Sequence, residues 1–386
     1  GRAKQNLLVK ATTLGKDLVI PTEYDNMGRR TKSYLPLPQN SLSGAIQPIS
    51  GTTVNNYYGI SNAYSEIVLD DSPLNRITES AFPGQDWIKS GGNTIQNDYD
   101  INISSDNVKK FSITTSWDSV NKIYTSSIPS TSTYGAGELY KYKITDEDKN
   151  VVYVFKDKLG RVVLNRKNDG VNDINTYYVY NDYNQQVYIV PPLASAKGTL
   201  TQTDLDELCY QYRYDDKNRL AEKKLPGKGL NPSTGIWIWE SMVYDNQDRL
   251  VMTQDANRKQ NNEWFFTKYD QLGRIAYTGI SAGGTRITEQ TNVNAKGNNN
   301  VTRTTTSGFT APGLLVYYDN IAANNYPNTF TTILSINYYD TYPTGSPTIP
   351  TTILTQDVLQ HNAQNSNIST KSLLTASFVK NIDNSA

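Results

Sequence analysis

Six consecutive residues, Tyr269-Asp270-Gln271-Leu272-Gly273-Arg274, decide the fold of this chain, because versions of the same stretch recur along its length. Each version has Asp or Asn at its second position and Gly, Asn or Asp at its fifth, and all but one end in Arg. The other copies are Tyr24–Arg29, Lys156–Arg161, Tyr214–Arg219, Tyr244–Arg249 and the degenerate Tyr180–Gln185. A search for repeats therefore comes before any search for catalytic motifs.

The residue types in these copies predict a tight turn. Gly, Asn and Asp tolerate a positive φ angle better than other residues do. An Asp or Asn at the start of a turn accepts a hydrogen bond from the backbone two residues on, and a left-handed residue three positions later forms the bulge that matches strand twist. We therefore predict a hairpin tip at each copy, with these structural turn residues: Tyr24, Asp25, Gly28, Arg29, Asp157, Gly160, Arg161, Tyr214, Asp215, Asn218, Arg219, Tyr244, Asp245, Asp248, Arg249, Tyr269, Asp270, Gly273 and Arg274.

The flanking residues alternate as strand residues do. Tyr210, Tyr212 and Tyr214 share one face of a strand, and Gln211 and Arg213 share the other. The copies that begin at residues 156, 180, 214, 244 and 269 lie 24 to 34 residues apart, which is enough for two strands and two turns. Because so small a unit cannot bury its own face, neighbouring units must stack. The pattern predicts an all-β fold of stacked β-hairpin repeats.

Composition agrees with this fold and excludes several functions. The 386 residues exceed one typical domain. The 37 Lys and Arg balance the 37 Asp and Glu, so no basic field attracts nucleic acid. The 28 tyrosines favour β-strands, in which a tyrosine buries its ring and leaves its hydroxyl exposed to water. Since no run of about 18 apolar residues occurs, we predict no membrane span.

Few residues are available for catalysis or metal binding. The single cysteine, Cys209, cannot form an internal disulfide and is interpreted as a small buried residue, and the single histidine, His361, as a surface residue. Two acidic groups, Asp146-Glu147-Asp148 and Asp169 with Asp173, lack the spacing of a calcium loop and are interpreted as hairpin tips. The repeated Asp and Arg are interpreted as structural, because a catalytic pair is needed only once. We predict no enzyme, no metal and no cofactor.

Three tryptophans are candidate binding residues. Trp237, Trp239 and Trp264 fall at strand spacing, and exposed aromatic rings stack on sugars or bind partners. The favoured interpretation is that these rings pack within the sheet, and binding is the alternative.

Outside the repeats the chain is less regular. We expect first repeat strands in residues 1–40, a loop-rich insertion with strands in 41–135, the repeat array in 136–282, and further strands and loops in 283–386. Residues 41–56 are expected to be a long surface loop, and residues 292–307 a loop or an exposed edge hairpin. Two short helices are expected, one capped by Thr203 over Asp204–Leu208 and one over Gln356–Gln364. The start at Gly1 and the lack of a closing element at the end favour a piece of a longer polypeptide, incomplete at its C-terminal end.

These motifs resemble the YD-repeat or Rhs-repeat family, whose signature is Tyr-Asp followed by Gly-Arg at this spacing. Further segments resemble the Rhs proteins of bacteria with type IX secretion, in an N-terminal or middle portion: Tyr34–Pro38, Pro83–Trp87, Leu208–Asp215 and Tyr338–Asp340. The resemblance implies a spiralling, hollow, cocoon-like shell that encloses a C-terminal toxin or effector segment of the same polypeptide. It also implies a secreted or cell-surface protein that meets secretion machinery. No catalytic residue is implied.

Two other functions stay open. The chain could be a surface adhesin that binds a cell-surface glycan or a partner through exposed Trp and Tyr. It could also be a glycosidase with paired carboxylates, although the sequence selects no pair.

Overall fold

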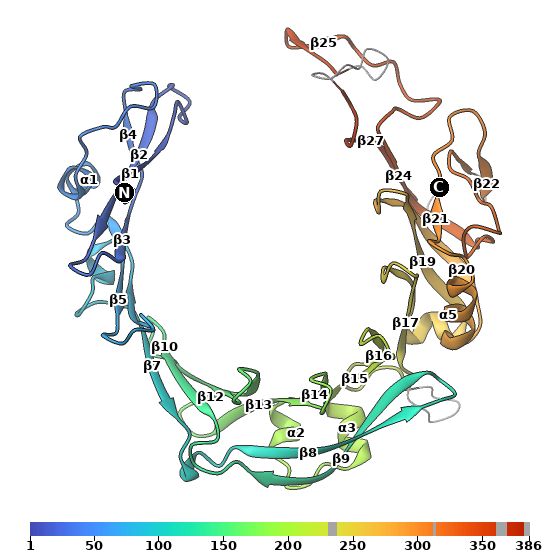
Figure 1. Ribbon diagram of the computed structural model, residues 1–386, viewed down its shortest axis with the longest axis horizontal. Coiled ribbons are helices and arrows are strands. Elements are labelled where there is room, and N and C mark those ends of the chain that lie inside the picture. Colours follow the sequence, from blue (N-terminus) through green and yellow to red (C-terminus); the bar gives the residue numbers. More distant parts are fainter. Residues whose placement is uncertain (231–237, 312–313, 360–368, 382–386) are drawn as a thin grey trace. The chain divides into compact units, whose positions relative to one another are not determined.

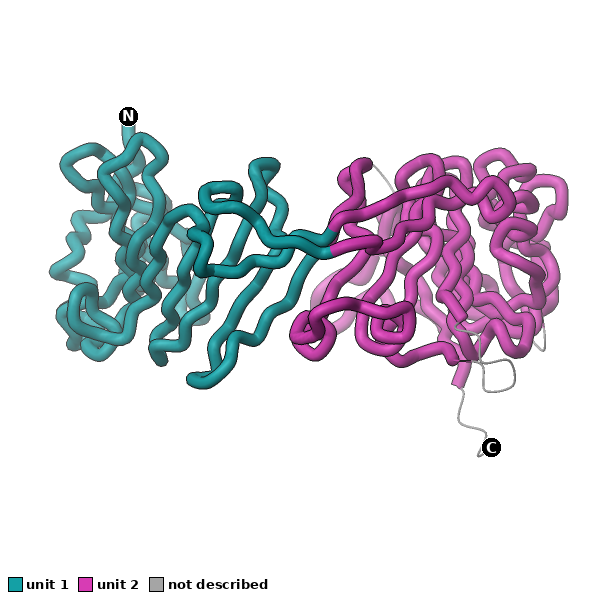
Figure 2. The backbone as a smooth tube through the Cα atoms, turned by 90° about the horizontal axis from the view of Figure 1, so that it is seen from below, with its two compact units in different colours: residues 1–111, 131–178 teal, residues 112–130, 179–386 magenta. Residues whose placement is uncertain are grey.

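The computed structural model describes residues 1–230, 238–311, 314–359 and 369–381. The chain forms two compact units, which Figure 2 shows in different colours: residues 1–111 with 131–178, and residues 112–130 with 179–386. These units are defined by which residues pack together in space. The four segments expected from the sequence were defined by where the repeat motif occurs, so the two divisions differ. Each unit is dominated by antiparallel strands, so the all-β class predicted from the sequence is confirmed.

Unit 1 is a run of antiparallel pairings between strands that mostly follow one another along the chain (Figure 1). The pairings are β1 with β2, β2 with β3 and β4, β3 with β5, β5 with β6, β6 with β7, β7 with β10, and β10 to β13 in order. The strands are β1 (Gln5–Leu8), β2 (Asp17–Tyr24), β3 (Arg30–Tyr34), β4 (Leu37–Gln39), β5 (Tyr64–Leu69), β6 (Ile77–Ala81), β7 (Ile95–Ile101), β10 (Tyr140–Thr145), β11 (Val151–Lys156), β12 (Val162–Asn168) and β13 (Asp173–Tyr180).

Unit 2 continues the same plan. Strands β14 to β20 pair antiparallel in order, β20 pairs with β24, and β24 pairs with β27, while the short β21 pairs parallel with β19. The strands are β8 (Lys109–Asp118), β9 (Ile123–Thr133), β14 (Gln186–Val190), β15 (Tyr210–Tyr214), β16 (Leu220–Lys224), β17 (Glu240–Tyr244), β18 (Leu250–Gln254), β19 (Glu263–Asp270), β20 (Ile275–Ala282), β21 (Asn300–Val301), β22 (Phe309–Ala311), β23 (Leu314–Val316), β24 (Thr332–Tyr339), β25 (Thr352–Ile353), β26 (Gln356–Asp357) and β27 (Leu374–Val379).

The described residues contain five short α-helices: α1 (Gly51–Tyr58), α2 (Pro192–Ser195), α3 (Gln202–Leu208), α4 (Ala256–Gln260) and α5 (Arg286–Asn294). Two 3₁₀ turns, Gln85–Trp87 and Ser104–Asp106, complete the helical segments. Helices α1 and α5 begin at Ser50 and Thr285, whose side chains accept hydrogen bonds from the first-turn backbone.

Several expectations outside the repeats were wrong. The cap of α3 is Thr201 and not Thr203, because the Thr201 hydroxyl and the Asp204 carboxylate form a reciprocal capping box. Gln356 and Asp357 lie in β26 rather than in a helix. The expected loops contain the start of α1 and the end of α5.

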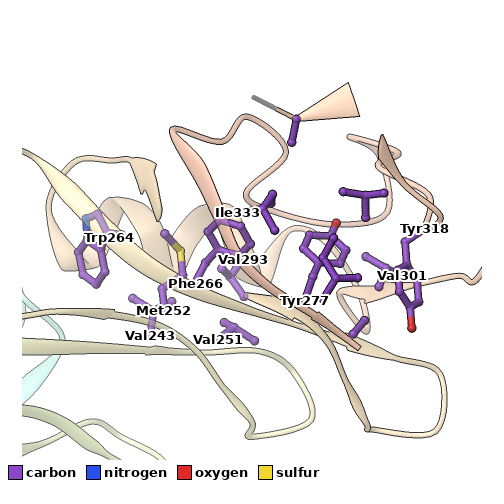
Figure 3. Close-up of a cluster of buried hydrophobic side chains, with 14 of the residues drawn as sticks. Val243, Val251, Met252, Trp264, Phe266, Tyr277, Val293, Val301, Tyr318 and Ile333 are labelled. Carbon is purple, nitrogen blue, oxygen red and sulfur yellow. The ribbon is translucent and has the colours of Figure 1, made fainter. Parts of the chain in front are cut away.

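The largest core lies in unit 2. On β19 the side chains alternate between half-buried and buried, which places Trp264 and Phe266 on the buried face. Tyr277 of β20, Val293 of α5 and Ile333 of β24 join them in one cluster (Figure 3). One face of the sheet is therefore covered by α5 and by the segment with β22 and β23, which adds Ala311 and Val316 to the cluster.

Candidate functional site: the Asp–Arg clamp of the hairpin turns

The turn at Asp270 shows how the repeated residues are used. One carboxylate oxygen of Asp270 accepts hydrogen bonds from the backbone N–H of Leu272 and of Arg274, both at 2.9 Å. The other oxygen accepts the side-chain Nε–H of Arg274 at 2.7 Å. We call this set of three hydrogen bonds, within one turn, the Asp–Arg clamp. It satisfies two backbone donors that a hairpin tip would otherwise leave to solvent.

The same clamp is present in the other full copies. Its hydrogen bonds measure 2.7 to 3.0 Å at Asp25 with Arg29, Asp157 with Arg161, Asp215 with Arg219, and Asp245 with Arg249. Recurrence with the same geometry at every copy is typical of a structural device and not of a single reactive site.

The backbone of each turn explains the choice of residue before Arg. The residue three positions after Asp has a positive φ at Gly28, Gly160, Asn218, Asp248 and Gly273. Its N–H donates to the Asp carbonyl, and the Asp N–H donates to the Arg carbonyl, as at Asp270 (3.0 and 2.9 Å). A register shift precedes Asp in each of these hairpins. Gly, Asn and Asp are the residues that accept this conformation at least cost.

A second contact joins one turn to the next. The hydroxyl of Tyr244 donates to the carbonyl of Leu220, the residue after Arg219, at 2.8 Å. The guanidinium of Arg219 lies 4.8 Å from the centre of the Tyr244 ring and donates to Asp248 at 2.7 Å. We call the Tyr hydroxyl bond to the residue after the preceding Arg the Tyr–carbonyl link. It fixes the spacing of adjacent turns through both a hydrogen bond and a cation–π contact.

The Tyr–carbonyl link recurs in both units. Its hydroxyl-to-carbonyl distances are 2.8 to 3.2 Å for Tyr99 to Ile77, Tyr214 to Gln186, Tyr269 to Leu250 and Tyr339 to Ile275. Tyr24 bonds Ala3 in the same way, with Arg2 above its ring. Where Asp340 occupies the next turn, Arg274 binds both of its carboxylate oxygens, at 3.1 and 2.7 Å.

Sequence reasoning missed one variant of the clamp, and at the other, Asp146, it predicted the hairpin tip but not the clamp. Asp70 and Arg76 form it across a longer loop, with Nε to carboxylate at 2.7 Å and Asn75 at positive φ. At Asp146 the side chain of Asn150 replaces Arg, at 3.0 Å. The sequence signal that could have identified both variants is an Asp at the end of one alternating strand pattern, followed by a polar residue at the start of the next strand pattern.

The degenerate copy is an uncharged clamp. Asn181 accepts the N–H of Tyr183 and of Gln185, and its side-chain amide donates to the Gln185 side chain at 2.7 Å. Gln185 in turn donates to Asn218 of the next turn at 2.8 Å. Since an amide pair reproduces the same geometry, the shape of the clamp does not depend on charge.

Hydrogen bonding shifts the acidity of several clamp carboxylates. The backbone N–H of Arg29 is the main cause that lowers the pKa of Asp25, and the side chain of Arg76 has this effect on the pKa of Asp70. Arg274 likewise lowers the pKa of Asp340. These carboxylates stay ionised to lower pH than ordinary ones, which suits an acceptor that must hold backbone donors.

The tryptophan candidates lie in different settings. Trp264 is fully buried, and its indole N–H donates to the Gly284 carbonyl at 3.1 Å, so it offers no ring face to a ligand, which agrees with packing and excludes the binding role considered for this residue. Trp239 is half-buried, with the Arg213 guanidinium 3.6 Å from the ring centre. Trp237 lies outside the described residues.

The remaining candidates show no reactive arrangement. The Asp146 carboxylate accepts hydrogen bonds from the backbone N–H of Asp148 and Asn150 in its own turn. Asp169 likewise accepts the N–H of Val171 and Asn172. Cys209 is fully buried, and burial raises the pKa of its thiol to about 12. His361 lies outside the described residues. Within the described parts of the chain, no group of three or more His, Cys, Asp or Glu is placed to hold a metal ion, and no helix is long and apolar enough to cross a membrane.

Comparisons with known proteins give one family model and several solved structures. The model of a domain of unknown function, DUF6443, matches residues 1–101. No curated protein matches the chain. The crystal structure of TcdB2-TccC3 without its hypervariable C-terminal region is similar at 13% identity and a TM-score of 0.42, over 89% of this chain and 13% of that one.

Two further structures are similar to about the same degree. TcdB2-TccC3 aligns at 12% identity and a TM-score of 0.40, over 76% of this chain and 13% of that one. The Photorhabdus luminescens Tc holotoxin pore aligns at 13% identity and a TM-score of 0.40, over 72% of this chain and 12% of that one. This chain thus spans about an eighth of the length of these relatives.

Proposed function

We propose that this chain is a structural wall of a secreted Rhs/YD-repeat-type protein, and that the wall encloses or carries a toxin or effector segment at the C-terminal end of the same polypeptide. The observation that carries the proposal is the Tyr–carbonyl link. At Tyr214, Tyr244 and Tyr269 a hairpin turn contacts the turn before it, so these repeats are built to pack on one another rather than to act as separate binding modules. The motif resemblance to YD-repeat proteins supports the same conclusion.

The wall proposal assigns no catalysis to these residues. The most regular charged side chains, Asp and Arg of the clamp, are neutralised by each other inside every turn. Export to the cell surface or the medium, and type IX secretion in particular, belongs to the proposal and rests on the motif resemblance. The partners it implies are the rest of the polypeptide and the secretion machinery.

Electron microscopy of the longest native polypeptide that contains this chain tests the proposal. We expect a closed hollow body with internal density. The matched control is the same polypeptide without its C-terminal segment, which should give a body of the same outline with less density inside. A sheet that is open, with its aromatic face in solvent, would contradict the wall.

Limited proteolysis gives an independent readout. The native protein should resist cleavage between the repeats, because the turns are clamped and linked. Arg219→Ala removes both a clamp and a contact to the next turn and should open cleavage sites between residues 214 and 250. Leu272→Ala, at a turn residue that is 71% exposed and bonds only through its backbone N–H, is the control and should leave the digestion pattern unchanged. Rapid cleavage of the native protein at every turn would contradict the proposal.

A glycan-binding surface is the second candidate, and one groove in unit 1 favours it. The groove has a volume of about 410 Å³ and is lined by Arg76, Tyr99, Asp100, Ile101, Tyr140 and Tyr142. Tyrosine rings beside a carboxylate and a guanidinium suit a sugar, which has both apolar and hydroxyl faces. Glycan-array binding that disappears in Tyr140→Ala and persists in Tyr57→Ala would support this function. No binding by the native protein would reject it.

A further inference from the structure

One lysine occupies a place in the core that its chemistry makes costly. Lys268 lies on the buried face of β19, after Trp264 and Phe266, and pairs in register with Tyr277 of β20. Its side chain is fully buried. A charged ammonium group in such a setting would need a carboxylate partner, since burying an unpaired charge is strongly unfavourable.

The hydrogen-bond partner of Lys268 is an amide instead. Its Nζ donates to Oδ1 of Asn325 at 3.1 Å, across 57 residues of sequence. Asn325 is fully buried as well, and its Nδ2 is a buried donor without a partner among the described residues. Buried polar groups are nearly always satisfied, so an unpaired amide beside a buried amine calls for an explanation.

The segment around Asn325 is held against α5 and against the residues that follow α5. The N–H of Tyr326 donates to Asn299 at 2.7 Å, and the Tyr326 hydroxyl donates to Glu289 of α5 at 2.6 Å. On the other side, Lys296 donates to the carbonyl of Ala322 at 2.8 Å. These contacts fix the segment that carries Asn325, so its side-chain amide stays within hydrogen-bond distance of the Lys268 amine, and a reaction between two groups held together loses little further entropy.

Burial also prepares the amine for reaction. Desolvation lowers the pKa of Lys268 well below its ordinary value, which favours the neutral amine with its free electron pair. The charged groups that act on it are Asp319 and Lys296. Asp319 is fixed near the site by the N–H of Thr302, which donates to its carboxylate at 2.9 Å. A carboxyl group in this position could carry protons between the amine and a leaving group.

We propose that Lys268 and Asn325 form an intramolecular isopeptide bond. The neutral Nζ attacks Cγ of Asn325, a new C–N bond forms, and the bond from Cγ to Nδ2 breaks. The amide nitrogen leaves as ammonia, taking up a proton that the amine gives up, with Asp319 as the proton carrier. No electrons are exchanged and no co-reactant is required. The bond joins β19 to the segment before β24 and removes the unpaired amide donor.

A second buried lysine serves as the internal comparison. The Lys224 side chain is also fully inaccessible, but it donates to the carboxylate of Asp206 at 2.5 Å and to the Asp206 carbonyl at 3.0 Å. Burial lowers the pKa of Lys224 as well, but the Asp206 carboxylate opposes this effect and favours the protonated amine, which has no free electron pair. Lys224 is therefore expected to remain unmodified in the same molecule.

Mass spectrometry of the full chain under denaturing conditions tests the proposal. The intact mass should be lower than that of the sequence by one ammonia, and digestion should yield one branched peptide that contains both Lys268 and Asn325. Proteolytic cleavage after Lys224 should be normal. Succinimide formation at an asparagine also releases ammonia but joins no two peptides, so the branched peptide separates the two reactions.

Three variants assign the roles. Asn325→Ala should abolish the mass loss, and Asp319→Ala should abolish it or slow it at least tenfold. Asn320→Ala, in the same segment, should keep it. The proposal is overturned by a native protein of unreduced mass, or by separate recovery of the peptides with Lys268 and Asn325. A bond that forms at the native rate in Asp319→Ala would overturn the role of Asp319 alone.

Discussion

The hydroxyl of Tyr244 donates a 2.8 Å hydrogen bond to the carbonyl oxygen of Leu220, which lies 24 residues earlier in the chain. The ring of the same tyrosine lies under the guanidinium of Arg219. One side chain thus contacts two consecutive turns and fixes the spacing between them. Because Tyr99, Tyr214, Tyr269 and Tyr339 make the same bond, the stacking of the hairpins depends on a repeated contact and not only on strand pairing.

Tyr244→Phe isolates the hydroxyl of this link. The ring and its cation–π contact remain, and one hydrogen bond is lost, so we expect the free energy of unfolding to fall by about 1 kcal/mol. Urea denaturation measures the change. Tyr183→Phe, at an exposed ring in unit 2, is the control and should have no effect. A Tyr244→Phe midpoint equal to that of the native protein would mean that the link carries no stability.

The clamps should differ in strength according to burial. The side chain of Asp245 is 0% exposed and that of Asp25 is 19% exposed. Asp245→Ala leaves two backbone donors and a guanidinium without their buried acceptor, and we expect a loss of about 3 kcal/mol. Asp25→Ala should cost less, because water can reach its donors. Equal midpoints for the two variants in guanidinium chloride would reject burial as the cause.

An uncharged clamp should preserve the turn. The pair Asn181 and Gln185 already has the required hydrogen bonds, so the double variant Asp215→Asn, Arg219→Gln is expected to unfold at a higher denaturant concentration than Asp215→Ala. A double-mutant cycle with the two single variants measures the coupling between the positions. If the double variant is no more stable than Asp215→Ala, the charge of the clamp is essential after all.

Helix α3 should make a pH-dependent contribution to stability. The Lys197 side chain is the main cause that lowers the pKa of Asp204 to about 2, from an ordinary 3.8. A carboxylate with a lowered pKa stabilises the folded state fully above its unfolded pKa, and this stabilisation is lost as the pH falls through the folded pKa. The stability difference between the native protein and Asp204→Asn should therefore shrink between pH 3.8 and about 2. Chemical denaturation at a series of pH values measures it, and a constant difference would contradict the assignment.

Cys209 should be inert in the folded protein. Its thiol is fully buried and has a raised pKa, so little thiolate forms at neutral pH. We expect no alkylation by iodoacetamide under native conditions and complete alkylation in guanidinium chloride. Fast native labelling would show that the α3 region opens readily.

The turns could be predicted because their contacts are local. Asp270 reaches Leu272 and Arg274 within five residues, so residue types and spacing are sufficient to indicate the clamp. The clamp at Asp70 escaped prediction because its partner, Arg76, lies two positions farther on than in the other copies. The burial of Trp264 could not be predicted from its sequence neighbours either. Its indole is covered by the segment that joins β20 to α5, where the Gly284 carbonyl accepts its N–H.

What the sequence by itself determined is the hairpin: its Asp, its left-handed residue, its Arg and the alternating strands on either side, all of which depend on contacts within a few residues. The tertiary structure decided which carbonyl each tyrosine meets, why Gln211 and Lys224 lie buried beneath α3, and why Lys268 lies against Asn325. These contacts join residues 6 to 64 positions apart. Their partners are set by strand order and by covering helices, which no short stretch of sequence encodes.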